Sequence, residues 1–219
     1  METAKEYCNR GLLKYNENDC PGAIADYNKA IELDPAYVFA YCSRSIAKVD
    51  MGDYKGALED CNKAIEFSPH FGFAYCTRGN IKTKLGDYRG AVIDCTKAIE
   101  IDPDKATYYY SRAAVKESSE DFDGAIEDYT KAIKLNPMDV NYYINRGALK
   151  LNLGDNIGAL EDYTKVIEVD PMYFNAYYNR GIVNYSLGKV NEACLDWSKA
   201  GELGDMDAYN LIKQYCNKK

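Results

Sequence analysis

Hydrophobic residues recur along this chain at helical spacing, in short stretches separated by turn residues. The stretch 56–69 reads GALEDCNKAIEFSP, with apolar residues three and four positions apart, which predicts an amphipathic helix that ends at a proline. It follows a GDY turn at 52–54, where the glycine ends one helix and the aspartate caps the next. Two helices joined by so short a turn predict a helical hairpin.

The same pattern returns every 34 residues. Six copies align without a gap over 4–37, 38–71, 72–105, 106–139, 140–173 and 174–207. Four columns hold residues suited to close helix packing: tyrosines (Tyr7, Tyr41, Tyr75, Tyr109, Tyr143, Tyr177), small residues (Gly11, Ser45, Gly79, Ala113, Gly147, Gly181), and two columns of alanine with one valine (Ala23, Ala57, Ala91, Ala125, Ala159, Ala193; Ala30, Ala64, Ala98, Ala132, Val166, Ala200). A fixed period of this length indicates a solenoid, in which each hairpin buries its apolar face against the next.

These columns resemble the tetratricopeptide repeat (TPR) over essentially the whole chain. The family's order also includes an aromatic between the two alanines (Tyr27, Tyr129, Tyr163, Trp197) and a closing proline (Pro35, Pro69, Pro103, Pro137, Pro171). The resemblance implies an all-α, α-α superhelical solenoid of six TPR hairpins, forming a single array over 1–219. It further implies a non-enzymatic scaffold that holds a peptide segment or a helix of a partner protein in a concave groove lined by the first helices.

Two columns depart from the family. Its usual leucine is arginine here (Arg10, Arg44, Arg78, Arg112, Arg146, Arg180), and its usual tyrosine is lysine until the last copy (Lys14, Lys48, Lys82, Lys116, Lys150, Asn184). An aspartate stands on the second helix of every copy (Asp26, Asp60, Asp94, Asp128, Asp162, Asp196). We therefore predict a ladder of Arg–Asp pairs, formed within a repeat or between neighbours.

Two other roles for the arginines stay open. They could extend to solvent while their stems cover the tyrosine column. They could bind anions, although the aspartate that accompanies each of them disfavours this.

The other face of each first helix changes freely between copies, and we call it the variable face. It begins with Lys5, Cys8 and Leu12 in the first copy and with Phe39, Cys42 and Ile46 in the second. Its only charged residues are Lys5, Asp50, Lys84 and Glu117, so the surface is neutral, with apolar patches separated by asparagines. Residues needed for stacking are held constant, so the variable face is the one free to bind.

We predict peptide binding on this face by Asn9, Leu12, Phe39, Ile46, Phe73, Asn80, Tyr110, Asn141, Asn145, Asn175, Tyr178 and Asn179. An asparagine can donate to and accept from a backbone amide, which suits sequence-tolerant peptide binding. TPR domains that grip the acidic tails of heat-shock chaperones use lysines and an arginine in the groove. Here the face has only isolated lysines and no arginine, so that carboxylate clamp is not expected.

Few other residues are candidates for metal binding or catalysis. Cys8, Cys42 and Cys76 form a column that we place on the variable face, and helices about 8–10 Å apart cannot bring these sulfurs together on one zinc ion. Cys61 and Cys95 replace the second-helix aromatic and are expected in the core. His70 follows Pro69 in a turn and is expected to be exposed. We predict no metal, no cofactor and no enzymatic activity.

Composition agrees with a folded, soluble chain. Of its 219 residues 47% are hydrophobic and 28% charged, enough to bury a core. Net charge is −7 with both signs interspersed, which argues against nucleic-acid or membrane partners. The opening residues METAKEYCNRGLLKY have no apolar targeting core. We therefore expect free thiols for all eight cysteines and a cytoplasmic location.

Three irregular places stand out. The turn 117–124 lacks the glycine cap and is the expected site of a changed hairpin angle or local fraying. The last copy has no closing proline and continues into an expected capping helix at about 208–216. Residues 1–3 provide no equivalent cap, so we keep open a homo-oligomer formed through the amino end. Self-assembly through the end surfaces is thus the alternative to peptide binding.

Overall fold

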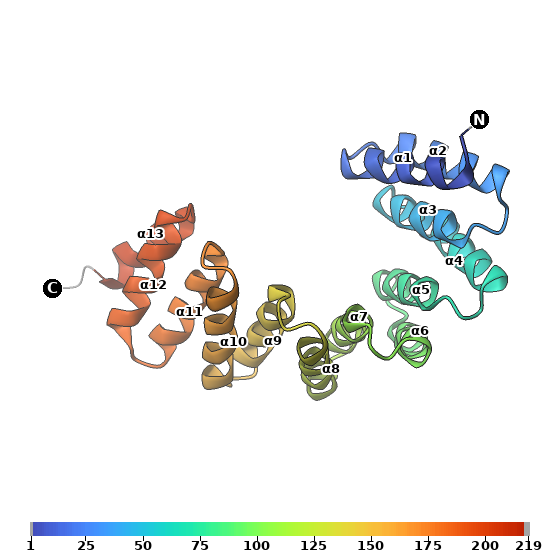
Figure 1. Ribbon diagram of the computed structural model, residues 1–219. Helices are drawn as coiled ribbons and strands as arrows, with labels where there is room; N and C mark the ends of the chain where they lie inside the picture. The colour runs from blue at the N-terminus through green and yellow to red at the C-terminus, as the bar shows by residue number, and fades with distance from the viewer. Residues whose placement is uncertain (1, 217–219) are drawn as a thin grey trace. The chain divides into compact units, whose positions relative to one another are not determined.

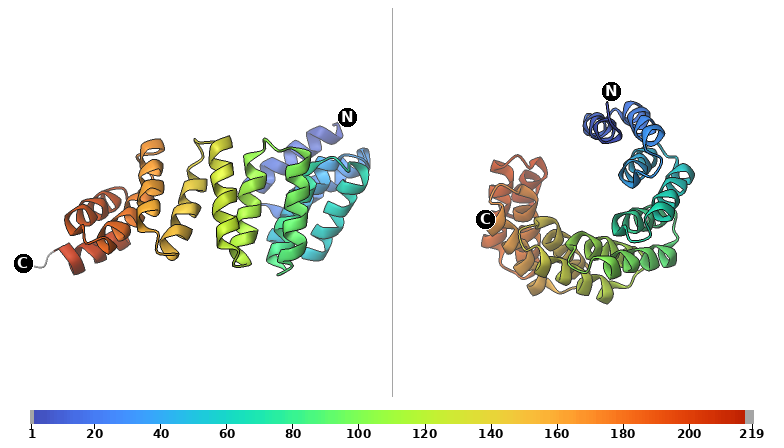
Figure 2. Two further views of the ribbon diagram at one scale, coloured as in Figure 1. Left: turned by 90° about the horizontal axis from the view of Figure 1, so that it is seen from below. Right: turned by 45° about the vertical axis from the view of Figure 1, so that its right-hand side comes forward.

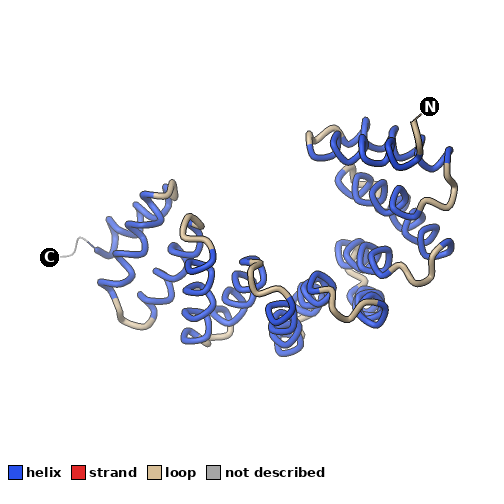
Figure 3. The backbone as a smooth tube through the Cα atoms, in the orientation of Figure 1, coloured by secondary structure: helices blue, strands red, loops and turns tan. Residues whose placement is uncertain are grey.

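The computed structural model describes residues 2–216, and all regular structure in that range is helical (Figures 1 and 3). The chain divides into two compact units, Met1–Asp121 and Phe122–Lys219, here unit 1 and unit 2. Unit 1 holds α1 (Ala4–Asn16), α2 (Cys20–Leu33), α3 (Val38–Asp50), α4 (Tyr54–Phe67), α5 (Gly72–Lys84), α6 (Tyr88–Ile101) and α7 (Ala106–Ser118). Unit 2 holds α8 (Phe122–Leu135), α9 (Val140–Asn152), α10 (Asn156–Val169), α11 (Phe174–Ser186), α12 (Val190–Glu202), α13 (Met206–Leu211) and a short π-helix η1 (Ile212–Cys216). The predicted all-α class of stacked hairpins is confirmed.

Unit 1 is a curved stack. Helices α1 and α2, α3 and α4, and α5 and α6 pair as hairpins, and each second helix packs on the first helix of the next hairpin. The first helices α1, α3, α5 and α7 also contact one another in turn, whereas no two second helices contact each other to that extent. The stack therefore bends with its first helices on the inner side, as Figure 1 shows for α5 and α6.

Unit 2 repeats the pairing of helices, but its first helices α9 and α11 do not contact each other to the extent seen in unit 1. Helices α9 and α10, and α11 and α12, form hairpins, with α8 packed on α9 and α10 on α11. The helices α13 and η1 pack on α12 at the carboxyl end. Figure 2 shows the helices of each unit standing side by side in chain order.

The turns follow the predicted chemistry. Gly52 and Gly86 have φ of 81° and 80°, and Asp53 accepts a bond from the backbone N–H of Gly56 at 2.9 Å. A Cβ on Gly56 would collide with the Asp53 carboxylate, so the glycine two residues into the helix makes room for the aspartate cap. This column of glycines belongs to the cap and not to a phosphate-binding loop.

Two turns use a left-handed residue other than glycine: Asn18 has φ of 63° and Glu120 has φ of 64°. The missing glycine cap predicted in 117–124 is thus real. The expected fraying is not observed, because Asp121 N still bonds Lys116 O at 2.8 Å, as Asp87 N bonds Lys82 O at 2.9 Å. Glu120 therefore holds the turn in a conformation that an L-residue disfavours.

The alanine columns form the centre of each hairpin. All eleven alanines and Val166 are fully buried, and so are the residues that fill the second-helix aromatic column, Cys61 and Cys95 among them. A Cβ on Gly11 would lie 2.6 Å from Tyr27 Cε1, and one on Gly181 would lie 2.5 Å from Trp197 Nε1. Small residues are therefore needed where the aromatic ring of the second helix meets the first helix.

The two ends of the described chain are finished in different ways. At the carboxyl end the extra helix starts at Met206, two residues before its predicted start, and changes to a π-helix at Ile212. At the amino end, Thr3 and Glu6 form a capping box on α1, which closes the first turn of that helix and does not cover the end of the stack. Glu2 also binds Arg10 at 2.9 Å.

Candidate functional site

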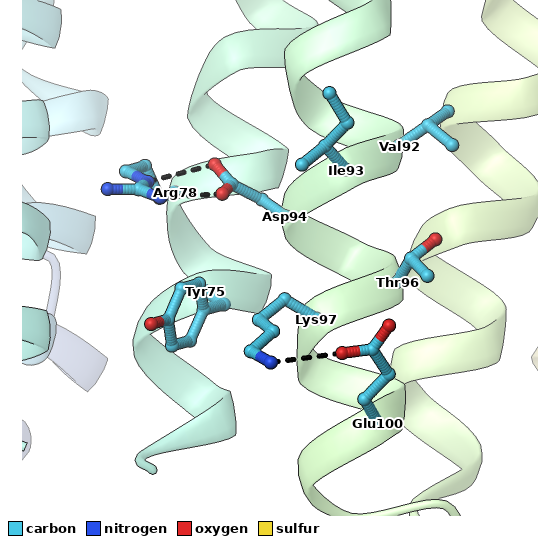
Figure 4. A pocket seen from close by; sticks show the side chains of 8 residues that line it. All are labelled: Tyr75, Arg78, Val92, Ile93, Asp94, Thr96, Lys97 and Glu100. Atoms are coloured by element: carbon cyan, nitrogen blue, oxygen red, sulfur yellow. Dashed lines mark hydrogen bonds and ion pairs between the residues drawn. The ribbon is translucent and has the colours of Figure 1, made fainter. Parts of the chain in front are cut away.

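The predicted Arg–Asp ladder is present, and each described pair forms within one repeat. The arginine Nη2 lies 2.5–2.6 Å from one carboxylate oxygen, and Nε bonds the other at 2.9–3.0 Å. The pairs are Arg10–Asp26, Arg44–Asp60, Arg78–Asp94, Arg146–Asp162 and Arg180–Asp196. Figure 4 shows this two-pronged contact for Arg78 on α5 and Asp94 on α6. Two parallel bonds fix both the distance and the rotation of the two helices.

The lysine column completes the site. Lys82 Nζ lies 2.7 Å from the same carboxylate of Asp94, and Lys14, Lys48 and Lys150 repeat this contact in their own hairpins. In the last copy Asn184 donates to Asp196 at 2.9 Å instead. Each of these aspartates is buried, with 3–7% of its side chain exposed, so it depends on its partners for compensation. The hydrogen bonds from Arg10, followed by those from Lys14, lower the pKa of Asp26 to about 2.

The arginines also link neighbouring hairpins. The third nitrogen of Arg44 bonds Asn28 Oδ1 of the preceding hairpin at 2.6 Å, and Arg78 bonds Asn62 in the same way at 2.7 Å. A threonine takes this place for Arg112, Arg146 and Arg180. The corresponding nitrogen of Arg10 bonds Glu2 Oε1 at 2.9 Å. The sequence left open whether the Arg–Asp pairs form within a repeat or between neighbours. In the structure each described ion pair joins the two helices of one hairpin, and the additional hydrogen bond of the arginine joins that hairpin to the preceding one.

The guanidinium groups also cover the tyrosine column. Their central carbon atoms lie 4.6–6.0 Å from the ring centres of Tyr7, Tyr41, Tyr75, Tyr109, Tyr143 and Tyr177. A depression of about 420 Å³ on this side is bordered by Tyr75, Arg78, Ile93 and the ion pair Lys97–Glu100 (Figure 4). Its charges are already paired within the chain, so this surface is a structural one.

The predicted binding residues lie on the first helices of both units. In unit 1, Asn9, Leu12, Phe39, Phe73 and Asn80 are exposed, and Ile46 and Tyr110 are half-buried. In unit 2, Asn141 and Asn175 are exposed, and Asn145, Tyr178 and Asn179 are half-buried.

A pocket of about 280 Å³ lies between α3 and α5 on the variable face of unit 1. Three of the predicted residues, Ile46, Phe73 and Asn80, line it. Its remaining walls come from Val49, Asp50, Cys76, Thr77, Ile81 and Lys84. The pocket is therefore apolar at its base, with one amide and one charge of each sign at its rim, and its volume suits a single apolar side chain.

An aromatic row adjoins this pocket. Phe39 meets Phe71 edge-on at 4.8 Å between ring centres, and Phe71 meets Phe73 at 5.9 Å. Tyr37 extends the row on the side of Phe39. Tyr37 and Phe71 were not among the predicted binding residues, although both stand two residues after a closing proline, which is the signal that could have found them.

The cysteine column is on the predicted side of the first helices but is not exposed. Cys8, Cys42 and Cys76 are buried among the first helices, and Cys76 also lines the pocket. Burial raises the pKa of all three thiols, and Cys76 Sγ bonds Ser111 Oγ of α7 at 3.3 Å. These positions point toward the next first helix, where the inner side of the stack is tight and a small apolar residue fits.

The first and second hairpins are joined by one further polar contact on the variable face. The Tyr15 hydroxyl donates to Asp50 Oδ2 at 2.5 Å, and this bond raises the pKa of Tyr15 to about 12. Asp50 also borders the pocket, so this bond positions one rim charge.

The expectation of eight free thiols was wrong for one pair. Cys194 of α12 and Cys216 of η1 form a disulfide with their Cα atoms 5.8 Å apart. The other six cysteines are free. Among residues 2–216, no group of three or more potential metal ligands comes together, and no helix is both long and apolar enough to cross a membrane.

Comparisons with known proteins agree with this geometry. Family descriptions "TPR repeat" and "Tetratricopeptide repeat" match residues 4–37, 40–71, 73–105, 118–154 and 151–188. Comparison with curated proteins gives no match.

Solved structures share the fold. YrrB, described as a TPR protein with an unusual peptide-binding site, has a TM-score of 0.65 at 23% identity, covering 86% of this chain and 97% of its own. MamA has a TM-score of 0.67 at 24% identity, covering 75% and 96%. PilF of Pseudomonas aeruginosa has a TM-score of 0.79 at 15% identity, covering 96% and 97%. With repeat matches over most of its length and this fold, the chain belongs to the tetratricopeptide-repeat family.

Proposed function

We propose that this chain is a non-enzymatic protein-interaction scaffold that holds a peptide segment of a partner protein on its variable face. The main support is the pocket between α3 and α5, which is an apolar recess on that face and borders the aromatic row of Phe39, Phe71 and Phe73. The opposite side of the hairpins offers mostly charges that are already paired. A neutral, partly apolar surface favours an uncharged peptide segment over an acidic tail.

Asn80 has the best position for backbone recognition. It is exposed at the rim of the pocket, and an amide there can donate to and accept from one peptide unit while a neighbouring side chain enters the recess. YrrB, with its peptide-binding site, supports this use of the fold. Asn9, Asn141 and Asn175 are exposed on other first helices and are proposed to act in the same way.

The test is selection from a phage-displayed library of random dodecapeptides. Enriched peptides should carry an apolar residue, and Phe73→Ala with Asn80→Ala should weaken them at least tenfold. The matched control is Ile93→Ala, an exposed apolar residue on α6 of the same hairpin, which should leave binding unchanged. If no peptide is enriched, or if the Phe73→Ala/Asn80→Ala variant binds as well as the Ile93→Ala control, the pocket is not the peptide-binding site.

Self-assembly through the end surface is the second candidate, and Leu13 is the observation that favours it. Its equivalents Ala47, Ile81, Val115, Leu149 and Val183 are at most 2% exposed against a neighbouring hairpin, whereas Leu13 is 63% exposed. Glu6 opposes such stacking, since the equivalent Ala40 and Ala74 are fully buried. Light scattering over a concentration series should show association that Leu13→Lys abolishes; a mass that stays monomeric would exclude this function.

We also propose that the six sequence repeats act as one array and that the protein works in the cytoplasm without a nucleic-acid partner. The net charge of −7 supports the last point. Stable disulfides are rare in reducing compartments, so the Cys194–Cys216 bond agrees with this location as a transient bond.

A further inference from the structure

The carboxyl-terminal cap, residues 206–216, is the one part of the described chain that a covalent cross-link holds. The disulfide joins Cys194 on α12 to Cys216, at the last described position of η1. One repeat earlier the corresponding residue of the second helix is Leu160, which packs on the apolar cluster that includes Val183 of the following first helix. A sulfur–sulfur bond thus stands where the preceding repeat uses an apolar contact.

The pair differs from the other cysteines in accessibility. Cys194 and Cys216 are both half-exposed, whereas five of the six free cysteines are buried and only Cys20 is partly accessible. Thiol–disulfide exchange requires a thiolate to approach one sulfur of the bond. A reductant can therefore reach this pair while the thiols of the core stay shielded.

The cap covers an aromatic cluster at the end of unit 2. Tyr215 lies 4.6 Å from Tyr185 and 5.9 Å from Trp197 between ring centres. Leu211 and Ile212 pack on the same cluster, together with Tyr178 and Ile182 of α11. Without the disulfide, these contacts and the α13 cap at Asp205 are what hold the cap in place.

We propose that Cys194–Cys216 is a redox-operated latch on the carboxyl-terminal cap. A dithiol reductant attacks one sulfur, forms a mixed disulfide and releases the other cysteine as a thiol; its second thiol then resolves the mixed disulfide. Cys194 and Cys216 together gain two electrons and two protons and become thiols, and the reductant becomes a disulfide. Disulfides of intracellular proteins commonly act in this transient way, which fits a bond found beside six free thiols.

Opening the latch loosens the cap. The bond closes a loop with a sequence separation of 22. For a loop of this size, reducing the disulfide removes stabilisation that corresponds to about a hundredfold increase in the equilibrium constant for opening of the cap. The cap then opens more often and uncovers Trp197, Tyr178, Ile182 and Tyr185, an apolar surface at the end of the last hairpin.

The test uses Trp197, which is the sole tryptophan of the chain and lies under the cap. Under oxidising conditions, tryptic digestion should yield VNEACLDWSK linked to QYCNK, and dithiothreitol should separate them. Reduction should shift Trp197 emission to longer wavelength and speed amide exchange in 206–216 about a hundredfold, with no change in α8–α10. Cys216→Ser should behave as the reduced protein in either buffer.

Cys20→Ser is the matched control, because it removes the one partly accessible free thiol and should keep the redox response. Absence of the linked peptides in the oxidised protein would overturn the proposal. So would exchange in 206–216 that is the same in oxidised, reduced and Cys216→Ser protein. Loss of helix on reduction throughout unit 2, read by exchange in α8–α10, would show a structural cross-link and not a latch.

Discussion

Removal of Asp94 should be strongly destabilising, because it leaves two neighbouring cations on α5 without their shared carboxylate from α6. In the native hairpin Arg78 and Lys82 share this one carboxylate at 2.6 and 2.7 Å, and Asp94 itself is 3% exposed. Breaking a buried ion pair from one side costs about 3–5 kcal/mol. The two cations keep 21% and 24% exposure and can partly hydrate, so Asp94→Ala should cost about 3 kcal/mol, the lower end of that range.

The assay is urea unfolding followed by far-UV circular dichroism, analysed with a nearest-neighbour scheme because repeat arrays do not always unfold as one unit. The variant Arg78→Met/Lys82→Met/Asp94→Leu removes all three charges and should return to within about 1 kcal/mol of wild type, because buried ion pairs add little over apolar residues of similar size. Lys97→Ala in the exposed Lys97–Glu100 pair of the same helix should cost less than about 0.5 kcal/mol. A loss below about 0.5 kcal/mol for Asp94→Ala would show that this carboxylate does not compensate two partly buried cations.

Three further outcomes follow from the structure. Glu120→Gly should raise the free energy of unfolding by about 1 kcal/mol, because it relieves a left-handed residue; an unchanged urea midpoint would contradict this. Gly181→Ala should lower it by about 1–3 kcal/mol and alter Trp197 emission, since the new methyl group would lie 2.5 Å from the indole nitrogen; an unaltered spectrum would show that the ring can move freely. The pKa of Asp26 is lowered from its ordinary value of 3.8 to about 2, so its stabilising contribution is complete above pH 4 and is lost as the pH falls toward 2. The melting temperature of the wild type should therefore fall over this pH range, and that of Asp26→Asn should fall less.

The Arg–Asp pairs were predicted from the sequence, but their lysine partners and their geometry were not. The columns of arginine and aspartate were visible because they keep the 34-residue period. The role of the lysines was missed, although Lys82 follows Arg78 by four residues and therefore lies on the same helix face. Whether the bonds ran within a hairpin or across could not be read, because both geometries satisfy the same period.

The variable face was assigned by a similar argument and with a similar limit. Helical spacing placed Ile46, Phe73 and Asn80 together, and the structure brings them to one pocket. The same spacing also assigned Cys42 to that face, where it is fully buried. Helical periodicity gives the direction of a side chain from its own axis, but burial depends on how closely the next first helix approaches, which the curvature of the stack decides.

The helices, their turns, the packed columns and the family follow from the amino-acid sequence, because each of these depends on residues close in the chain or repeated at a constant interval. Three features required the folded arrangement of the helices: the sharing of Asp94 between two cations, the pocket between α3 and α5, and the bond between Cys194 and Cys216. These features join residues of different helices at distances set by stacking. Cys194 replaces an apolar residue of one column and Cys216 lies beyond the last repeat, so the 34-residue period does not indicate that the two cysteines pair.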